Sequence, residues 1–282
     1  MNKLDLSQLD SFLRAALDED IGSGDITTNF CVAETATSTG KFIAKEPGVI
    51  SGLDVVCRVF QLIDNAVDIR LLVRDGDTVC AGDIVAQISG PSRAILTGER
   101  TALNILQHMS GIATKTAKAV EEINGTGTQI LDTRKTTPCM RRLEKYAVTC
   151  GGGTNHRLNL ADGILIKDNH IRAAGSVTKA VQLMKKIGAE ANIKVEVETE
   201  NLAQIEEALA AGSDIIMLDN MSLEMMSQAV QLIDGRAKTE ASGNMDERSL
   251  IDVAKTGVDY ISIGALTHSV KAMDISLRFD SN

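Results

Sequence analysis

Aromatic residues are nearly absent from the sequence. It contains no tryptophan, and aromatic residues make up only 2% of its 282 residues. Hydrophobic residues nevertheless account for 44% of the chain, so the core must consist mainly of aliphatic side chains. Such a core suits a parallel sheet covered by helices. The shortage of aromatic rings argues against the stacking platforms that bind single-stranded nucleic acids.

Long apolar runs and paired cysteines are missing as well. No run approaches the roughly 18 apolar residues of a membrane span, and the N-terminal segment lacks the apolar core of a signal peptide. The five cysteines are widely separated and form no CxxC pair, which favours reduced thiols. No histidines or cysteines have metal-ligand spacing, so we expect no tightly bound transition metal. These absences predict a cytoplasmic protein without a membrane partner.

The chain is acidic, with a formal net charge of −9, but the window of residues 131–172 is basic. A basic pocket on an acidic protein indicates a small ligand that carries several negative charges. A nucleic acid or a membrane would require a broader basic face, so neither is expected as a partner. The eight basic residues of the window, against four acidic ones, are Arg134, Lys135, Arg141, Arg142, Lys145, Arg157, Lys167 and Arg172.

The first part of the chain is predicted to form a small domain. Apolar residues at helical spacing predict helices over residues 1–20 and 92–123, and residues 36–90 predict short strands separated by tight turns. One part of this stretch is typical of lipoyl carrier modules, but no lysine stands at an exposed hairpin tip. We predict an N-terminal α/β sandwich domain over residues 1–112, with the C-terminal tail 271–282 packing back on it.

After residue 128 the pattern changes to strands that alternate with helices. Polar residues at the ends of successive strands recur at intervals of 21, 23 and 22 residues, from Glu198 to Asp219, Ser242 and Gly264. A strand–helix unit repeated at this length predicts an α/β barrel. Only six or seven such strands fit, so we predict an incomplete barrel over residues 113–270.

The chemistry of such barrels takes place where the strands end and the following loops begin. Arg134 and Lys135 directly follow the first strand of the barrel. Arginine binds carboxylates through two parallel hydrogen bonds, whereas lysine supplies a point charge for phosphate. The other unusual residues expected at strand ends are His156, Arg157, Lys167, Glu198, Asp219, Ser242, Gly243, Asn244 and Gly264.

Three charged residues near this end of the barrel leave several kinds of chemistry open. Lys167 ends an almost wholly apolar strand, where it could form a Schiff base or hold an anion by its charge. Glu198 and Asp219 could bind sugar hydroxyls, hold a phosphate-bound Mg²⁺, or act as acid and base. Helix caps and loop ion pairs are the alternatives. Because Glu196 alternates with Glu198, we expect only one of the two to face the ligand.

Glycine-rich stretches offer places where backbone amides could meet an anion. The triple glycine at 151–153 lacks the spacing of a P-loop or of a dinucleotide-binding fingerprint, and a flexible turn is the simpler interpretation. Ser242-Gly243-Asn244 and Gly264 close the last two strands, where barrels often bind phosphate. His268 could add a donor there or serve as a helix cap.

Seven stretches of the second half resemble the quinolinate phosphoribosyltransferase family: TRKTTP, GGGTNHRLNL, GILIKDNHI, VEVE, IIMLDN, EASGN and SIGALTHS. EDIGSGDITT and GERTALNILQHMSGIAT resemble the same family, so the likeness spans nearly the whole chain in order. The resemblance implies that quinolinate and phosphoribosyl pyrophosphate give nicotinate mononucleotide, pyrophosphate and CO₂ in NAD biosynthesis. It also implies Mg²⁺, and a homodimer in which Arg100 reaches the site of the neighbouring subunit.

The resemblance further implies roles for individual residues. Lys135, Lys167, Glu198 and Asp219 are the expected catalytic residues, and Mg²⁺ would be held through the substrate with Glu198 and Asp219 nearby. Thr133 is expected among the substrate-binding residues. The quinolinate pocket would contain Arg134, His156, Arg157 and Lys167. The phosphoribosyl pyrophosphate side would contain Lys135, Glu198 and Asp219. The 5′-phosphate cradle would contain Ser242, Gly243, Asn244, Gly264 and His268.

The sequence departs from the family pattern at Cys139 and Met140, where we expect a glycine and another apolar residue, and at Asn244, where many members have glycine. From the residues alone, two other functions stay open: a Schiff-base aldolase that uses Lys167, and a non-catalytic carrier. Relatives with similar barrels could also use other pyridine substrates.

Overall fold

A computed structural model describes residues 4–280 of the chain. The chain divides into two compact units. The first contains the chain up to Ala117, Thr137–Gly152 and the chain from Val270 onward, and the second contains Lys118–Thr136 and Gly153–Ser269. The long helix α4, Ser92–Glu122, begins in the first unit and ends in the second.

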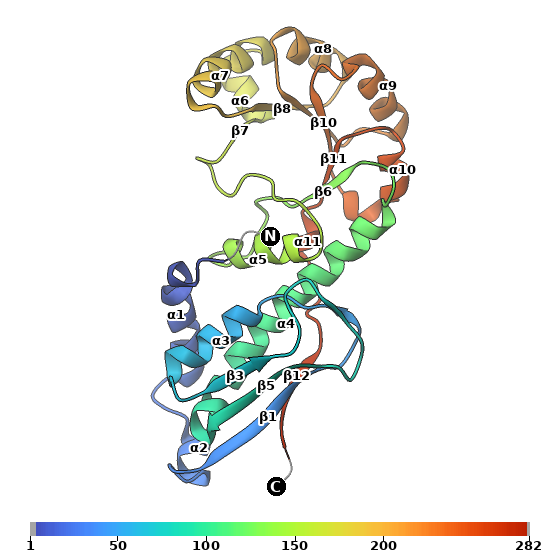
Figure 1. Ribbon diagram of the computed structural model, residues 1–282. Helices are drawn as coiled ribbons and strands as arrows, with labels where there is room; N and C mark the ends of the chain where they lie inside the picture. Colours follow the sequence, from blue (N-terminus) through green and yellow to red (C-terminus); the bar gives the residue numbers. More distant parts are fainter. Residues whose placement is uncertain (1–3, 281–282) are drawn as a thin grey trace. The chain divides into compact units, whose positions relative to one another are not determined.

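The first unit is built on a four-stranded antiparallel sheet with the order β12-β1-β5-β3 (Figure 1). The C-terminal strand β12 pairs with β1, so the tail lies at the edge of this sheet. The rings of Phe42 and Phe60 meet edge to face in the core, with centroids 6.4 Å apart. The strands are β1 Thr37–Ala44, β3 Asp68–Leu71, β5 Ile84–Pro91 and β12 Ile275–Phe279, with a small pair of β2 Gly48–Val49 and β4 Thr78–Val79.

Helix α3, Leu53–Ile63, interrupts the stretch that the sequence predicts as strands alone. Its valines favour strands locally, but Val55, Val56 and Val59 are buried at helical spacing. Burial of this apolar face outweighs the local preference, because tertiary packing supplies most of the stability of a helix. The other helices of the unit are η1 Leu6–Leu9, α1 Asp10–Ile21, α2 Ile26–Cys31 and α5 Arg141–Cys150.

The second unit contains a sheet of six parallel strands with the order β6-β11-β10-β9-β8-β7. This is the predicted incomplete barrel, since no pairing joins β6 to β7 within the described residues. The strands are β6 Gln129–Leu131, β7 Ile164–Ile166, β8 Val195–Thr199, β9 Ile215–Asp219, β10 Lys238–Ser242 and β11 Tyr260–Ser262. The helices are α6 Asp168–Ala174, α7 Val177–Ala191, α8 Leu202–Ala210, α9 Leu223–Ile233, η2 Met245–Glu247, α10 Leu250–Ala254 and α11 Ala265–His268.

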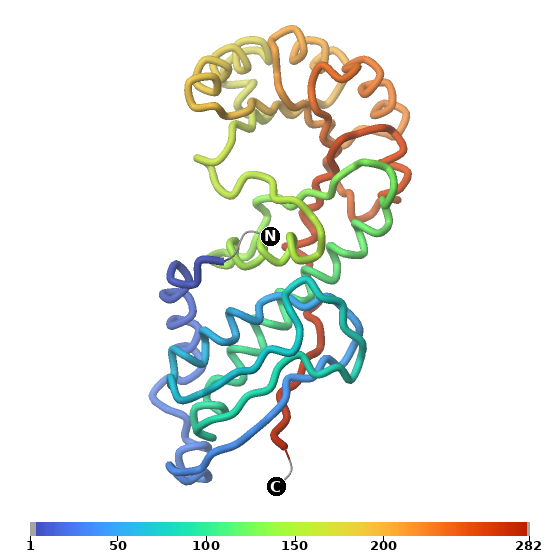
Figure 2. Tube along the Cα trace, in the orientation of Figure 1, coloured from blue at the N-terminus to red at the C-terminus, as the bar shows by residue number. Residues whose placement is uncertain are grey.

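The chain between 153 and 163 runs beside the free edge of β6, as the yellow-green part of the tube in Figure 2 shows. Thr154 donates its backbone N–H to the carbonyl of Ile130 (2.8 Å) and accepts from the N–H of Asp132 (3.2 Å). The segment therefore pairs with β6 like a very short strand. It brings His156 and Arg157 to the open side of the barrel.

Glu196 and Glu198 both face the interior of the barrel, which corrects the expectation that only one of them does. Residues two apart in a strand point to the same face. The alternate positions Val195 and Val197 are fully buried on the opposite face of β8. Glu196 borders a cavity of about 290 Å³ that is also lined by Gln129, Ile215 and Tyr260, the first residues of β6, β9 and β11. The predicted site residues His156 and Arg157 also line this cavity, whereas Lys167, Glu198, Asp219 and Ser242 lie at the carboxyl ends of the strands.

Candidate active site

The carboxyl ends of the barrel strands bring most of the predicted site residues into one unit. Arg134 and Lys135 follow β6, and Lys167 precedes the first residue of α6 at the end of β7. Glu198 lies near the end of β8, and Asp219 and Ser242 end β9 and β10. In a parallel sheet these ends share one edge, so the charged groups form the mouth of the barrel.

Lys167 and Glu198 form an ion pair at this mouth, with 3.2 Å between Nζ and Oε2. Glu198 keeps only 14% of its side chain exposed, whereas Lys167 keeps 48%. Burial raises the pKa of Glu198, Lys167 lowers it, and the nearby charges of Asp219 and Asp168 raise it further. Negative charge is therefore concentrated around Glu198 and Asp219, and one lysine only partly compensates it.

Asn220 connects two neighbouring strand ends. It is not among the site residues that the sequence predicts. Its Nδ2 donates to Oδ2 of Asp219 (2.8 Å), and its backbone N–H donates to the carbonyl of Ser242 (3.0 Å). Gly243 has φ +97° and lies against the Asn220 side chain, where a Cβ would collide. The positions of Asp219 and of the Ser242–Asn244 turn are thus fixed together. The only hint in the sequence is an asparagine directly after the strand.

Lys135, Gly264 and His268 lie in contact at another part of the mouth. A Cβ at Gly264 would lie 2.9 Å from Cδ of Lys135 and 3.2 Å from Cδ2 of His268, so the glycine allows both side chains to approach. Thr267 donates its hydroxyl to the carbonyl of Lys135 (2.7 Å), and the Lys135 N–H donates to Oγ1 of Thr133 (3.0 Å). The start of α11 and the loop after β6 form one surface.

The charge of Arg134 is near enough to act on Arg157. The pKa of Arg157 is lowered, first by burial and then by the charge of Arg134, while Glu196 acts in the opposite direction. Arg157 donates from a guanidinium nitrogen to the carbonyl of Gly163 (3.1 Å). Two neighbouring guanidinium groups are suited to a ligand with carboxylate or phosphate groups.

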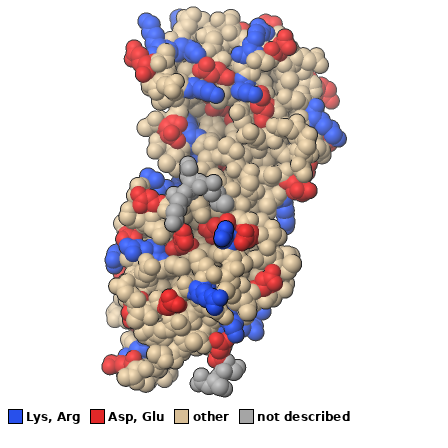
Figure 3. All heavy atoms as spheres, viewed as in Figure 1, with Lys and Arg blue, Asp and Glu red and all other residues tan. Residues whose placement is uncertain are grey.

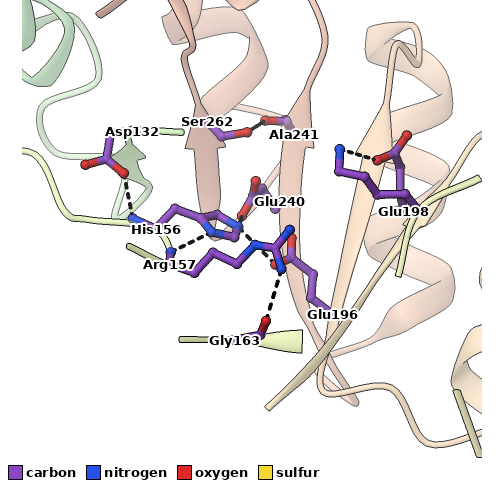
Figure 4. Close-up of polar contacts among 10 residues, drawn as sticks. Asp132, His156, Arg157, Gly163, Glu196, Glu198, Glu240, Ala241 and Ser262 are labelled. Atoms are coloured by element: carbon purple, nitrogen blue, oxygen red, sulfur yellow. Dashed lines mark hydrogen bonds and ion pairs between the residues drawn. The ribbon is translucent and has the colours of Figure 1, made fainter. Parts of the chain in front are cut away.

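Next to Arg157, His156 contacts a buried pair of carboxyl groups (Figure 4). Its Nε2 lies 3.0 Å from Oε2 of Glu196 and 3.6 Å from Oε2 of Glu240. The two glutamates are 4% and 1% exposed. Burial and the neighbouring Glu196 raise the pKa of Glu240 to about 8. The sequence analysis names Glu196 only as the alternative to Glu198 and does not single out Glu240, which lies in the polar strand KTEAS.

Arg100 and Cys139 belong to the first unit. Arg100 is exposed on α4. Cys139 is exposed, with φ +65°, a conformation that favours glycine. On the face shown in Figure 3, acidic and basic side chains are interspersed over the surface. Among the described residues, no helix combines the length and the apolar composition that crossing a bilayer requires.

Comparison with known protein families assigns both parts of the chain. Residues 25–110 match the model of the quinolinate phosphoribosyl transferase N-terminal domain, and residues 112–278 match that of the C-terminal domain. The chain belongs to the quinolinate phosphoribosyltransferase family. The predicted family and enzyme class, a phosphoribosyltransferase, are therefore confirmed.

Curated relatives of the family cover almost all of this chain. A probable nicotinate-nucleotide pyrophosphorylase [carboxylating] from Bacillus subtilis is 45% identical over 278 residues, which are 98% of this chain and 94% of the relative. A quinolinate phosphoribosyltransferase [decarboxylating] from Nicotiana tabacum is 41% identical and covers 97% of this chain and 83% of its own length.

Solved structures show the same fold at similar identity. NadC from Streptococcus pyogenes is 47% identical, covers 100% of both chains and superimposes with a TM-score of 0.91. The nicotinate-nucleotide pyrophosphorylase from Francisella tularensis is 43% identical, covers 99% of this chain and 98% of its own, and has a TM-score of 0.93. The predicted fold class, an N-terminal α/β domain followed by an incomplete barrel, is confirmed.

Proposed function

We propose that the chain transfers the phosphoribosyl group of phosphoribosyl pyrophosphate to quinolinate in NAD biosynthesis, with both substrates bound at the mouth of the barrel. The observation that carries this assignment is that Arg134 and Arg157, whose charges are near enough to interact, share one barrel unit with the ion pair of Lys167 and Glu198. Quinolinate carries two carboxylates on one ring. Such a dianion relieves the repulsion between the two arginines and gains a bidentate partner.

Quinolinate would lie between the loops after β6 and before β7. Arg134 and Arg157 would bind its carboxylates, Lys167 would add charge from the end of β7, and His156 supports this side of the site. Arg100 would complete the pocket from the neighbouring subunit of a homodimer, as the family resemblance implies. The enzyme would act in the cytoplasm.

Phosphoribosyl pyrophosphate would lie on the opposite side of the mouth. Lys135 suits a phosphate as a point charge, and Thr133 helps to shape its loop. The 5′-phosphate would meet the backbone amides at the ends of β10 and β11. This cradle consists of Ser242, Gly243, Asn244, Gly264 and His268.

Glu198 and Asp219 fit a magnesium ion held mainly through the pyrophosphate. Both are carboxylates, which Mg²⁺ prefers, and their proximity raises the pKa of Glu198. A cation there would offset this repulsion. When bound, Mg²⁺ would neutralise charge on the leaving pyrophosphate. Apart from that ion, Lys135 stabilises the same leaving group and the two carboxylates stabilise positive charge that develops on the ribose.

The reaction requires no covalent enzyme intermediate. The bond between the anomeric carbon and pyrophosphate breaks, and the pyridine nitrogen of quinolinate supplies the electron pair for the new bond. The resulting pyridinium ring accepts the electrons of the adjacent C–CO₂ bond, so CO₂ leaves and a proton takes its place. Lys167 is paired with Glu198, which favours a charged ammonium over the neutral amine of a Schiff-base aldolase.

The assignment is tested by assaying the purified protein with quinolinate or nicotinate, each with phosphoribosyl pyrophosphate and Mg²⁺. We expect the absorbance of quinolinate to fall in its assay, and the concentration of nicotinate to stay constant in the other.

Arg134→Ala and Arg157→Ala should each lower kcat/KM for quinolinate at least about 100-fold, with unchanged circular dichroism. The matched control is Arg236→Ala, because Arg236 follows α9 and contacts only the last carbonyls of that helix among the described residues. Near-normal turnover in both site variants would overturn the pocket assignment.

A further inference from the structure

The hydrogen bonds of His156 fix which ring nitrogen carries the proton. The backbone N–H of Arg157 donates to Nδ1 at 2.7 Å. A backbone N–H is always a donor, so Nδ1 must accept and cannot carry a proton. The proton therefore lies on Nε2, which points to Oε2 of Glu196 at 3.0 Å. Both ring nitrogens are used within the protein, and the ring connects the backbone of Arg157 to β8.

The carboxyl groups that receive this ring form a buried unit of their own. Glu196 on β8 and Glu240 on β10 both approach Nε2 of His156, and one ligand atom from each of the three residues lies within 4.8 Å of the others. Each glutamate has one oxygen, Oε1, that meets no hydrogen-bonding partner in the described part of the chain. Buried carboxyl groups are costly unless their oxygens find hydrogen-bonding partners. Nε2 of His156 is the partner for Oε2 of Glu196, and the charge of Glu196 is near enough to act on Arg157.

Other contacts hold the segment that carries Arg157 at the edge of the sheet. It pairs with β6 through Thr154, but the sheet offers no strand on its other side in the described residues. Asp132 accepts the backbone N–H of His156 (2.9 Å), and the carbonyl of Gly163 receives the Arg157 guanidinium (3.1 Å). The contacts from Nε2 of His156 to Glu196 (3.0 Å) and Glu240 (3.6 Å) tie this segment to β8 and β10 in the middle of the sheet.

We propose that Glu196, supported by Glu240, is a positioning residue: through the Nε2–H of His156 it anchors the loop at 154–157 and so sets the guanidinium of Arg157 beside that of Arg134. The inference rests on the proposed quinolinate pocket. The polar groups that face the glutamate pair come from several elements: His156 and Arg157 from the loop, and Ser262 from β11.

Steady-state kinetics of Glu196 variants separate positioning from general stability. Glu196→Gln keeps an oxygen that accepts the Nε2–H, and we expect its KM for quinolinate to stay within about threefold of the wild type. Glu196→Leu removes the acceptor and should raise that KM at least about tenfold, with KM for phosphoribosyl pyrophosphate changed by less than about twofold. Glu240→Gln keeps a polar group of the same size next to Glu196, and its KM for quinolinate should also stay within about threefold of the wild type.

The matched control is Ile216→Val, which shortens a fully buried side chain on the face of β9 that points away from the glutamates. It should lower stability while leaving both KM values close to those of the wild type. Equal changes in the two KM values for Glu196→Leu, or failure of Glu196→Gln to restore the quinolinate KM, would overturn the proposal.

Nitrogen NMR of the histidines tests the same contact without measuring activity. The chain has only four histidines, so signals of ¹⁵N-labelled protein can be assigned with His156→Gln as the reference. We expect His156 to show a protonated Nε2 and an unprotonated Nδ1 in the wild type, and a changed Nε2 signal in Glu196→Leu. An imidazolium, or a proton on Nδ1, would contradict the inference. If this pattern is found but quinolinate is not consumed, the pocket assignment fails while the anchoring contact stands.

Discussion

Single residues in unusual backbone conformations show where this chain departs from its family. Cys139 has φ +65°, at the position where the sequence pattern leads us to expect glycine. Asn244 replaces glycine at φ +50° in the same way. Asparagine tolerates this left-handed region, whereas cysteine gains nothing there. The two departures therefore have different energetic consequences.

We expect Cys139→Gly to raise the free energy of unfolding by about 0.5–1 kcal/mol, because the cost of the left-handed conformation slightly exceeds the added entropy of glycine in the unfolded chain. Urea denaturation measures the change. The control is Asn192→Gly, with φ +52° at the end of α7, where the substitution should alter stability by no more than a few tenths of a kcal/mol. A loss of stability in Cys139→Gly would contradict the argument.

Glu240 makes the stability of the barrel depend on pH. Its pKa rises from 4.5 to about 8 on folding, so the folded state holds a proton that the unfolded state releases. The contribution of this proton is fully present below about pH 4.5 and is lost as pH rises through about 8. Glu240→Gln removes that dependence. The variant should therefore gain stability relative to the wild type between about pH 5 and about pH 9, as measured by urea unfolding across this range. If the free energies of unfolding of the two proteins change in parallel with pH, Glu240 is not the group that causes the dependence.

At the scale of secondary structure, the start of α3 depends on a side chain from a distant turn. Both oxygens of Asp75 accept backbone N–H groups, from Gly52 and Leu53, at 3.0 Å each. Tyr146 of α5 donates its hydroxyl to the same carboxylate at 2.9 Å. One partly buried carboxylate thus supports the N-terminus of one helix and the packing of another within the first unit.

Removal of this carboxylate should weaken the first unit without altering the barrel mouth. We expect Asp75→Ala to lower the free energy of unfolding by about 2 kcal/mol, and Tyr146→Phe by about 1 kcal/mol, since the former leaves two N–H groups and a hydroxyl without their partner. Urea denaturation gives both values. Activity per folded molecule should remain within about twofold in each variant, and a selective loss of quinolinate turnover would show that the effect is not confined to stability.

The elements that the sequence predicts well are those whose pattern is local. The regular spacing from Glu198 to Gly264 gives the second unit its strands, and helical periodicity gives α4 over almost its full length. Helix α3 could not be distinguished from a strand, because its valines favour strands and only its burial decides. The roles of Glu196 and Glu240 arise because β8 and β10 direct these two side chains into the same barrel interior. The sequence of either strand alone does not show that they meet.

At the scale of the whole molecule, the family resemblance predicts that Arg100 acts in the neighbouring subunit of a homodimer. A symmetric dimer contains two equivalent sites, each with a barrel from one subunit and Arg100 from the other. This arrangement can be tested by mixing two inactive proteins, because each site then depends on two different chains.

We expect Arg100→Ala and Arg157→Ala to be inactive separately and to recover activity after they are unfolded together and refolded as a mixture. Random pairing makes half of the dimers mixed, and one of the two sites in each mixed dimer has both arginines, so about a quarter of the wild-type activity should return. As a control, Arg134→Ala mixed with Arg157→Ala should recover nothing, since both changes lie in the same barrel and no pairing places an intact set of arginines in one site. If Arg100 acts on the barrel of its own chain, the first mixture would also stay inactive, because every site would then carry one of the two defects.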